Sequence, residues 1–310
     1  MKTYGIGVVG TGIMGRRMIA ALSPHPRFRV TALWDANPEA MAQALDNAPG
    51  VRLASSLEAL ADDDQVDAIY IATPPVLHLA GVRAAAALAK PVLCEKPLAA
   101  CVEDAQALRE LVARDGLRFA VNFPFARASA ARQLLQQWHS GALGRLQRAS
   151  ITLRFAQWPR PWQAGASNWL AGPLQGGFSR EVLSHFVFLA LRLFGPARVE
   201  RLLIEREAGQ SETRLLARLH HDGVSVEIDA AVAGTLADHN RFALVGSGHS
   251  LALSDWYRLE ENGQTSERRD PSPGTLDGLA EMLDGQAGHR LADVDEALAV
   301  ARIIEALLAD

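Results

Sequence analysis

The sequence contains very little cysteine: among 310 residues there are only Cys94 and Cys101. Two cysteines cannot form a disulfide framework, and this usage is typical of a reducing compartment. The sequence also lacks a run of about 18 apolar residues, the length needed by a membrane-spanning helix. Its first residues read as a strand entering a glycine turn, without the apolar stretch and cleavage site of a signal peptide. We therefore expect a cytoplasmic protein without a membrane partner.

Neither sign of charge is in large excess, because 31 Lys and Arg residues stand against 35 Asp and Glu residues, giving a formal net charge of −4. We therefore expect no nucleic-acid partner. His220 and His221 are adjacent in a predicted strand and would point to opposite faces, and no other cluster has metal-ligand spacing, so no metal site is expected. Neither a Gly-x-Ser-x-Gly motif nor a P-loop occurs.

The first part of the chain alternates between apolar runs and helical stretches. Composition is ordinary for a globular protein, with 49% hydrophobic and 21% charged residues, and the length favours two domains. Continuous apolarity marks strands buried on both faces, and repeated strand–helix alternation indicates a doubly wound α/β fold. We predict a dinucleotide-binding Rossmann domain over residues 1–122. Its expected strands are Ile6–Val9, Val30–Trp34, Val51–Leu53, Ala68–Ile71, Val92–Cys94 and Phe119–Val121.

After Asn122 the strands become longer and alternate between apolar and polar residues, which is typical of a sheet with one open face. We predict a C-terminal α+β domain over residues 123–310 with an open, largely antiparallel sheet, and Asp222-Gly223 marks a hairpin. The exposed face favours a homo-oligomer, a dimer or tetramer, formed through this sheet. The terminal helix, 293–310, is a candidate to pack back on the first domain. The expected strands are Leu146–Phe155, Val199–Glu207, Thr213–His220, Val224–Val232 and Arg241–Val245, and the helices are Ala126–Ser140, Glu181–Phe194 and Asp293–Leu308.

The first motif is a G-x-G-x-x-G pattern that follows the first predicted strand and opens a helix. It comprises Gly10, Thr11, Gly12, Ile13, Met14 and Gly15. Gly10 permits a tight turn, Gly12 lets the backbone approach a pyrophosphate, and Gly15 allows close helix–strand packing. The phosphates would sit at the helix N-terminus, where unpaired N–H groups favour negative charge. The pattern predicts a nicotinamide dinucleotide site, although a plain glycine turn with a solvated acidic residue is the alternative.

Asp35 follows the second predicted strand, 20 residues after Gly15. A carboxylate at this place accepts hydrogen bonds from the ribose hydroxyls of NAD and repels the 2′-phosphate of NADP. The next residues, Ala36 and Asn37, provide no cation to offset that repulsion. The sequence therefore favours NAD over NADP.

Glu95 and Lys96 follow the fifth predicted strand, and Pro97 comes next. Ligands of open α/β sheets bind at the carboxyl ends of the strands, so Lys96 is expected near the nicotinamide. An amine in that place can exchange a proton with a reacting substrate. The alternative is a loop lysine paired with a neighbouring acid.

At these motifs the sequence resembles the glucose–fructose oxidoreductase and inositol dehydrogenase (Gfo/Idh/MocA) family, over essentially its whole length. The resemblance implies hydride transfer between nicotinamide and a substrate carbon, usually a secondary alcohol of a sugar or cyclitol. It implies that Lys96 binds the reacting oxygen or transfers a proton to or from it, with Glu95 nearby and a cis Lys96–Pro97 bond. The motifs that carry it, in the family's order, are Gly10–Gly15, Ala72-Thr73-Pro74 with His78, Cys94-Glu95-Lys96-Pro97, Asn122, and Gly176-Gly177 leading to His185.

The resemblance also implies that Thr73, Pro74 and His78 border the cofactor. Asn122 would lie beside the nicotinamide ribose or the substrate.

The family's second catalytic element is Asp-x-Gly-x-His on a helix, where this chain has Glu181, Leu183 and His185. Residues four apart share a helix face, so Glu181 and His185 can point together into a pocket. His185 would shuttle a proton with Lys96 or hydrogen-bond a substrate hydroxyl, although a core histidine flanked by phenylalanines is the alternative. The longer Glu181 and the bulkier Leu183 put a standard aldose or inositol substrate in doubt.

Three further residues are weighed as substrate contacts. Arg180 would meet an acidic substrate group or, alternatively, form a structural salt bridge. Trp162 and Trp169 lie in a loop rich in tryptophan and proline that would wall the pocket or simply pack.

The sequence thus predicts an NAD-dependent alcohol dehydrogenase or carbonyl reductase for a polyhydroxylated or cyclic small molecule. One alternative keeps the fold and reduces a C=N or C=C bond of a cyclic substrate. Another is a regulatory protein that binds NAD without turnover, since fold alone does not determine function.

Overall fold

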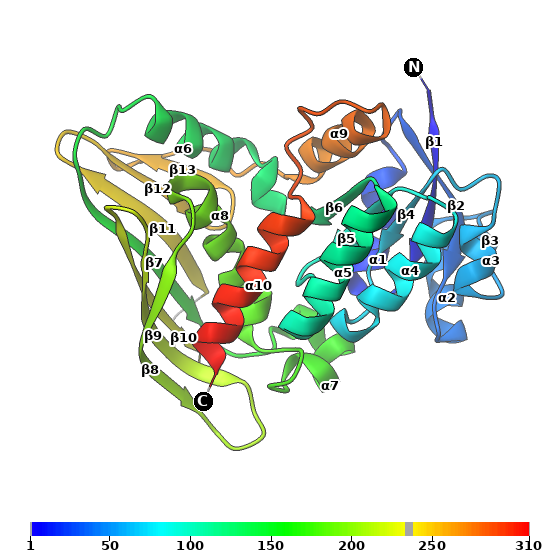
Figure 1. Cartoon of the computed structure of the whole chain (residues 1–310), viewed down its shortest axis with the longest axis horizontal. Coiled ribbons are helices and arrows are strands. Elements are labelled where there is room, and N and C mark those ends of the chain that lie inside the picture. The colour runs from blue at the N-terminus through cyan, green and yellow to red at the C-terminus, as the bar shows by residue number, and fades with distance from the viewer. Residues whose placement is uncertain (1, 233–237, 310) are drawn as a thin grey trace. The chain divides into compact units, whose positions relative to one another are not determined.

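The computed structural model describes residues 2–232 and 238–309. The chain divides into two compact units. The first consists of Met1–Phe123 and Thr275–Leu298, and the second of Pro124–Gly274 and Ala299–Asp310 (Figure 1). A segment near the end of the chain therefore belongs to the same unit as the N-terminal sheet. Division into independent domains at residues 122 and 123 stays a prediction.

The sheet of the first unit has six parallel strands in the order β3-β2-β1-β4-β5-β6. This is the strand order of a Rossmann fold, in which ligands bind at the carboxyl ends of the strands near the point where the order reverses. The predicted doubly wound parallel sheet is confirmed. Its strands are β1 (Tyr4–Val9), β2 (Phe28–Trp34), β3 (Arg52–Leu53), β4 (Ala68–Ile71), β5 (Val92–Glu95) and β6 (Phe119–Asn122).

Helices cover both faces of this sheet. In Figure 1, α4 and α5 lie in front of the strands and α1 lies behind them. Tyr70 of β4 and Leu93 of β5 share a buried apolar core with Ile19 of α1 and Leu279 of α9, so α9 completes this core. The helices are α1 (Ile13–Leu22), α2 (Pro38–Ala44), α3 (Leu57–Ala61), α4 (His78–Ala87), α5 (Val102–Asp115) and α9 (Ser272–Leu283), of which residues 275–283 belong to this unit.

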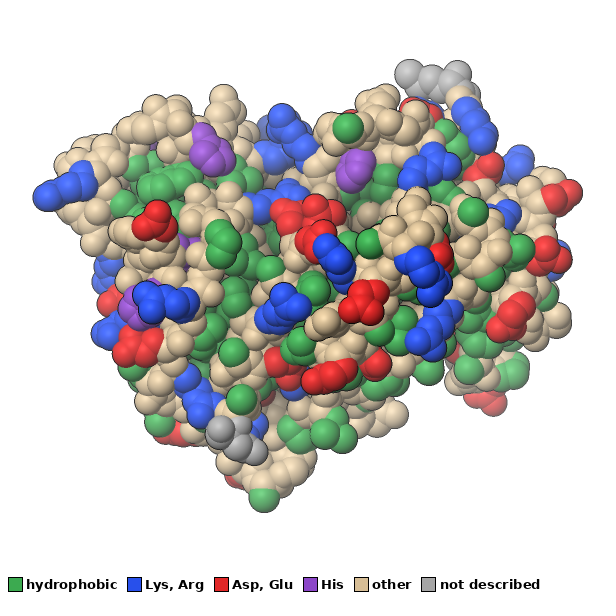
Figure 2. All heavy atoms as spheres, viewed as in Figure 1, with side chains coloured by type: hydrophobic (Ala, Val, Ile, Leu, Met, Phe, Trp, Pro, Cys, Tyr) green, Lys and Arg blue, Asp and Glu red, His purple; other side chains and the backbone are tan. Residues whose placement is uncertain are grey.

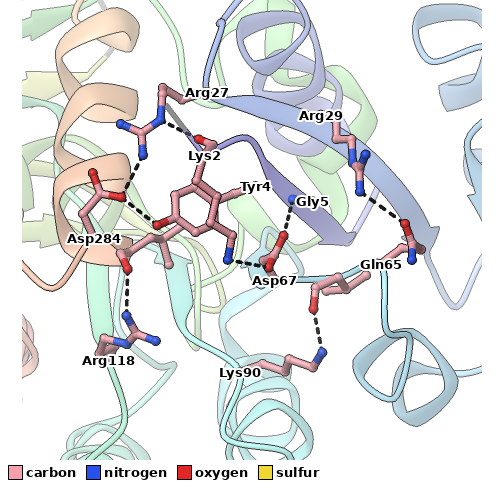
Figure 3. Close-up of polar contacts among 12 residues, drawn as sticks. Lys2, Tyr4, Gly5, Arg27, Arg29, Gln65, Asp67, Lys90, Arg118 and Asp284 are labelled. Carbon is pink, nitrogen blue, oxygen red and sulfur yellow. Dashed lines mark hydrogen bonds and ion pairs between the residues drawn. The ribbon is translucent and has the colours of Figure 1, made fainter.

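Polar contacts fasten α9 to the amino ends of the strands, as Figure 3 shows. The Tyr4 hydroxyl donates to Asp284 Oδ1 at 2.7 Å, and Arg27 Nη2 donates to the same oxygen at 2.8 Å. Arg118, just before β6, donates to the carbonyl of Leu283 at 2.8 Å. These bonds lie at the edge opposite the glycine turn, so this end of the sheet is occupied by structural contacts.

The second unit contains an eight-stranded sheet in the order β14-β13-β12-β11-β7-β10-β9-β8. Among the described strand pairs of this second sheet only β7–β10 is parallel, which confirms the predicted open, largely antiparallel sheet. The predicted hairpin at Asp222-Gly223 joins β9 and β10. The strands are β7 (Leu146–Phe155), β8 (Arg198–Arg206), β9 (Glu212–His220), β10 (Ser225–Val232), β11 (His239–Gly246), β12 (Ser250–Ser254), β13 (Arg258–Glu261) and β14 (Gln264–Thr265).

On one face of this sheet, helix α6 contacts strands β12 and β13 and also helix α8, whose residues from Ser184 to Ala190 are all buried. The helices of the unit are α6 (Ser129–His139), α7 (Ser167–Leu170), a π-helical turn (Ser179–Leu183), α8 (Ser184–Phe194) and the part of α10 (Val294–Leu308) from residue 299. No helix within the described residues is long and apolar enough to cross a bilayer.

The other face of the sheet carries ion pairs between neighbouring strands. Arg154 of β7 pairs with Asp229 of β10 at 2.6 Å, and Arg148 pairs with Glu227 at 2.9 Å. Arg241 of β11 pairs with Glu260 of β13 at 2.8 Å, across the intervening strand β12. Figure 2 likewise shows positive and negative side chains interspersed over the viewed surface of the molecule.

Candidate functional site

The glycine turn between β1 and α1 has the geometry expected of a phosphate cradle. Gly10 has a φ of +90°, and a Cβ there would lie 2.6 Å from the carbonyl carbon of Ala72. At Gly15 a Cβ would lie 2.0 Å from the Gly10 oxygen, so only glycine fits. Among the described residues none comes within 4 Å of a Cβ built at Gly12. Open space therefore lies over the middle glycine, where a pyrophosphate needs to approach.

Helix α1 begins at Ile13 directly behind this space. Its N-cap residue, Gly12, has no side chain to cap the first N–H groups, which therefore remain available to an anion. The hydroxyl oxygen of Thr73, after β4, is buried and has no hydrogen-bond partner among the described residues. A buried hydroxyl without a partner is costly, so a bound ligand would satisfy it. The residues present fit a nicotinamide dinucleotide.

Asp35 is hydrogen-bonded to the glycine turn itself. Its Oδ2 accepts from the Thr11 backbone N–H at 2.7 Å and from the Thr11 hydroxyl at 3.2 Å, while Oδ1 accepts from the Asn37 N–H at 2.9 Å. A carboxylate offers about four acceptor sites, so capacity remains for ribose hydroxyls. Arg16, which the sequence analysis did not weigh, donates to the Thr11 carbonyl at 3.0 Å and brings a positive charge to this turn.

His78, the first residue of α4, is completely buried and lies between two loops at the carboxyl edge of the sheet. Its Nε2 lies 2.9 Å from the Thr73 carbonyl and its Nδ1 lies 3.3 Å from the Leu98 carbonyl. Burial lowers the pKa of His78, so the neutral ring has one N–H, and the shorter contact favours donation to Thr73. His78 therefore orders the Thr73 loop against the segment that follows Lys96.

Glu95, the last residue of β5, is buried in a cluster of hydrogen bonds. Its Oε1 accepts from the Tyr70 hydroxyl and, at 2.6 Å, from Asn122 Nδ2. Burial, with a further contribution from the Glu95 charge, raises the pKa of Tyr70 well above its ordinary value, so the phenol stays a donor. The three side chains come from adjacent strands β4, β5 and β6 at their carboxyl ends.

Lys96 follows this cluster, and its backbone is fixed by Glu95 before it and Pro97 after it. Its backbone N–H lies 3.3 Å from Glu95 Oε2, and the Lys96–Pro97 peptide bond is cis, as the resemblance implied. Lys96 is half-buried, while Glu95 and Pro97 beside it are buried. The structure thus brings Lys96, Glu95 and Asn122 to the same edge of the sheet as the glycine turn.

In the second unit, Glu181 lies in a π-helical turn, Ser179–Leu183, which precedes helix α8. The Ser184 N–H reaches back to the Ser179 carbonyl, five residues earlier, and the Ser184 hydroxyl donates to the Arg180 carbonyl at 2.7 Å. The expected α-helix from Glu181 is therefore π-helical in its first turn. Such single turns occur often at functional sites. Leu183 is fully buried, whereas Glu181 is half-buried.

His185, in the first turn of α8, is buried beside aromatic rings. The Trp256 ring meets it edge to face at 5.5 Å, and the Phe125 ring lies 5.8 Å away. Trp256 and its neighbour Asp255 have φ values of +66° and +44°, in the left-handed region that non-glycine residues rarely adopt. Asn240 holds this turn by accepting the Trp256 N–H on its side-chain oxygen at 2.8 Å.

Arg180 is buried and hydrogen-bonded inside the second unit. Its Nε and Nη2 donate to the two carboxylate oxygens of Glu305 at 2.6 and 2.7 Å. Its Nη1 donates to the carbonyls of Pro173 and Gly176 at 2.6 and 3.0 Å. For Arg180 the sequence analysis left open a substrate contact or a structural salt bridge, and these contacts correspond to the salt bridge.

Trp162, weighed as a substrate contact, is 41% exposed and lies against Arg160, with the guanidinium carbon 4.6 Å from the ring centre. Trp169 is half-buried, and its backbone oxygen lies 2.2 Å from a Cβ built at Gly176, so the first of the paired glycines must be glycine.

The chain is similar in sequence to known proteins. Residues 4–123 match the family described as an oxidoreductase family with an NAD-binding Rossmann fold, Gfo/Idh/MocA. Inositol 2-dehydrogenase 2 from Saccharopolyspora erythraea is 30% identical over 258 residues, covering 81% of this chain and 73% of the relative. The chain belongs to the Gfo/Idh/MocA family. The resemblance seen in the sequence is thereby confirmed, and the first unit of this Gfo/Idh/MocA protein is an NAD(P)-binding Rossmann fold.

Other relatives match over a shorter part of their length. Levoglucosan dehydrogenase from Pseudarthrobacter phenanthrenivorans is 27% identical over 208 residues, which cover 63% of this chain and 52% of the relative. An uncharacterized oxidoreductase from Streptococcus pneumoniae serotype 4 is 35% identical over 136 residues, 42% of this chain and 36% of the relative. The Gfo/Idh/MocA chain thus spans about half or less of the length of these two relatives.

Solved structures share the fold of both units. The WlbA dehydrogenase from Bordetella pertussis, in complex with NADH and UDP-GlcNAcA, has a TM-score of 0.84 at 21% identity, over 99% of this chain and 95% of that one. KijD10, a 3-ketoreductase from Actinomadura kijaniata in complex with NADP and TDP-benzene, has a TM-score of 0.81 at 20% identity, over 99% and 97%. These two structures of the same fold thus hold different nicotinamide cofactors, NADH and NADP.

Two side chains of the site escaped the sequence analysis. Tyr70 sits in a short apolar strand, where it counted only as a buried residue, although a buried phenol needs a partner. Trp256 follows Asp255 in a turn that lacks the glycine or asparagine usual for left-handed backbone. Only the tyrosine carried a usable signal.

Proposed function

We propose that this protein is a nicotinamide-dependent dehydrogenase or reductase that acts on a secondary alcohol or carbonyl of a sugar, cyclitol or related cyclic molecule. The observation that carries the proposal is the buried Tyr70–Glu95–Asn122 cluster directly before Lys96, at the edge of the sheet where the glycine turn is open to a pyrophosphate. A structural lysine would not need a buried carboxylate fixed by two donors behind it. The names of the relatives, which include inositol and levoglucosan dehydrogenases, support the substrate class.

The nicotinamide, when bound, carries the hydride, and the protein handles the proton and the position of the substrate. Lys96 Nζ exchanges the proton of the reacting oxygen. Glu95, fixed by Tyr70 and Asn122, places negative charge beside the lysine and keeps its backbone in one position. His185 and Glu181 hydrogen-bond substrate hydroxyls, and His185 is able to pass a proton.

For the cofactor we propose NAD. The Asp35 carboxylate at the end of β2 favours free ribose hydroxyls and repels a 2′-phosphate. Arg16 beside Thr11 brings an opposing positive charge, so the preference rests on the balance of the two residues. Thr11, Gly12, Ile13 and Met14 would surround the pyrophosphate.

We further propose a homo-oligomer formed through the open face of the second sheet, in the cytoplasm. The broad sheet face supports the first point, and the two free cysteines, Cys94 and Cys101, support a reducing compartment. Light scattering of the purified protein tests the oligomer, and a monomer would contradict it.

The function is tested with a panel of cyclitols, anhydrosugars and aldoses, followed by NADH or NADPH absorbance. Replacing Lys96 by Ala should lower kcat for any active substrate by about 10²- to 10⁴-fold, the usual contribution of general acid–base catalysis, and leave the Kd of NAD nearly unchanged. Lys90→Met is the matched control, because Lys90 donates to the Asp63 and Val66 carbonyls at the opposite end of β5.

An active Lys96→Ala variant would disprove the proton role. NAD binding without turnover of any compound would favour the regulatory alternative. Products reduced at a C=N or C=C bond, identified with isotopically labelled cofactor, would favour the other enzyme.

A further inference from the structure

Four aromatic rings surround an arginine in the second unit that the sequence did not single out. The guanidinium carbon of Arg160 lies 4.6 Å from the ring centre of Trp162. It lies 5.7 Å from each of three more ring centres, those of Phe155, Trp158 and Trp256. The rings come from β7, from the loop after it and from the turn between β12 and β13. Segments distant in sequence therefore converge on one cation.

The orientation of Arg160 is fixed by Gln163, which is 98% buried. Gln163 Oε1 accepts from both Arg160 Nε and the Arg160 backbone N–H, each at 3.1 Å. A guanidinium has five N–H donors, and Gln163 accepts from the one at Nε. A guanidinium that is partly removed from water by rings binds an anion in its plane more strongly than a solvated one does.

Trp256 connects this cation to His185. Its ring contacts both the guanidinium of Arg160 and, edge to face, the ring of His185. The left-handed backbone of Asp255 and Trp256 is of the kind that persists where the surroundings enforce it, commonly at functional sites. Arg160 and His185 therefore contact the same indole ring.

We propose that Arg160 is the anion-binding residue of the substrate site, and that the substrate is a polyhydroxylated ring bearing a carboxylate or phosphate. The anionic group pairs with the edge of the Arg160 guanidinium, the ring lies along Trp256, and a hydroxyl reaches His185. Arg160, and not Arg180, is thus the cation that selects the substrate. This inference rests on the proposed function for the reaction, but the binding of the anion stands by itself.

The test is isothermal titration calorimetry of the NADH-loaded protein with matched ligands. D-glucose is compared with D-glucuronate and D-glucose 6-phosphate, and D-galactose with D-galacturonate. We expect at least one anionic ligand to bind about tenfold or more tightly than its neutral counterpart, as a hydrogen bond to a charged group allows. The carboxylate and phosphate arms distinguish the two sources of charge.

Arg160→Gln should abolish this preference, and Arg160→Lys should keep part of it, because lysine retains the charge but not the planar fork. Arg192→Gln is the matched control, since Arg192 also lies over an aromatic ring, 4.5 Å from the centre of Phe188, in the same unit. Thermal melting of each variant separates loss of folding from loss of binding. The control should keep the wild-type preference.

Equal affinity for charged and neutral ligands, absence of binding by every anionic ligand, or a preference that survives Arg160→Gln would each overturn the inference. Turnover of NAD is followed in parallel. Oxidation of neutral sugars without any charge preference leaves the proposed function standing and removes the inference. Arg160-dependent binding of an anion without turnover of any compound supports the inference and contradicts the proposed function.

Discussion

Glu95 and Asn122 occupy paired positions on the neighbouring strands β5 and β6, and their side chains are joined by a hydrogen bond of 2.6 Å. The register of two parallel strands thus sets a carboxylate and an amide side by side at the carboxyl edge of the sheet. Tyr70, one strand further, donates to the same carboxylate oxygen. Three strands therefore hold the residue that precedes Lys96.

Removing the Tyr70 hydroxyl should impair both stability and turnover. We expect Tyr70→Phe to lower the free energy of unfolding by about 1–3 kcal/mol, because the buried carboxylate loses a donor. It should also lower kcat and shift its pH profile, which a purely structural residue would leave unchanged. Tyr4→Phe is the control, since Tyr4 donates to Asp284 at the opposite end of the sheet. Equal kinetic effects of both variants would contradict a positioning role for Tyr70.

Asp35 is expected to determine the choice of nucleotide. Asp35→Ala should raise the Kd of NAD by about 10- to 100-fold through loss of hydrogen bonds to a charged acceptor. It should also raise the ratio of kcat/KM for NADP over NAD, because Arg16 remains beside the turn. Cofactor titrations of this variant and of Asp46→Ala, an exposed control, measure the effect. An unchanged ratio would show that Asp35 only hydrogen-bonds Thr11 and does not select the nucleotide.

The burial of His78 predicts a dependence of stability on pH. Because its pKa is lowered in the folded state, only the unfolded chain takes up a proton as pH falls below the ordinary value of 6.5. The stabilisation is therefore present above that pH and is lost toward the lower folded-state pKa, by at most about 1.4 kcal/mol per pH unit. Denaturant unfolding at several pH values between 5 and 7 measures this. The free energy of unfolding should fall less steeply with decreasing pH for His78→Gln than for the wild type.

His221 is the control for this measurement, since burial lowers its pKa as well. His221→Gln should likewise make the free energy of unfolding less dependent on pH, without changing cofactor affinity. His78→Gln should in addition weaken cofactor binding, because His78 orders the Thr73 loop. Identical slopes for His78→Gln and the wild type would be incompatible with the interpretation.

Breaking the Arg180–Glu305 pair should cost stability more than substrate affinity. Arg180→Met leaves the Glu305 carboxylate and two carbonyls without their donors, and we expect a loss of about 3 kcal/mol, as for other buried pairs. Arg109→Met, which removes the exposed pair with Asp295, should cost less than about 1 kcal/mol. A large rise in KM with unchanged stability would instead assign Arg180 to the substrate.

Periodicity was sufficient to predict the six strands of the first sheet, because strands buried on both faces leave an unambiguous apolar run. It failed for α9, whose start contains Pro273 and Gly274, and for the short strands β12 to β14. The glycine turn and Lys96 could be predicted because their roles depend on local backbone. Trp256 could not be predicted, and for Tyr70 the sequence signalled only that a buried phenol needs a partner, because the partners of both residues are brought together by the fold.

The return of residues 275–298 to the first unit has a consequence for biosynthesis. The nucleotide-binding unit cannot be completed until the chain as far as residue 298 has left the ribosome. Until then the surface that receives α9 stays open, and β6 lacks the bridge that Val121 forms with Ala292. A fragment ending at Phe123 should therefore aggregate, and a shortened version of this protein would have to carry both stretches on one polypeptide.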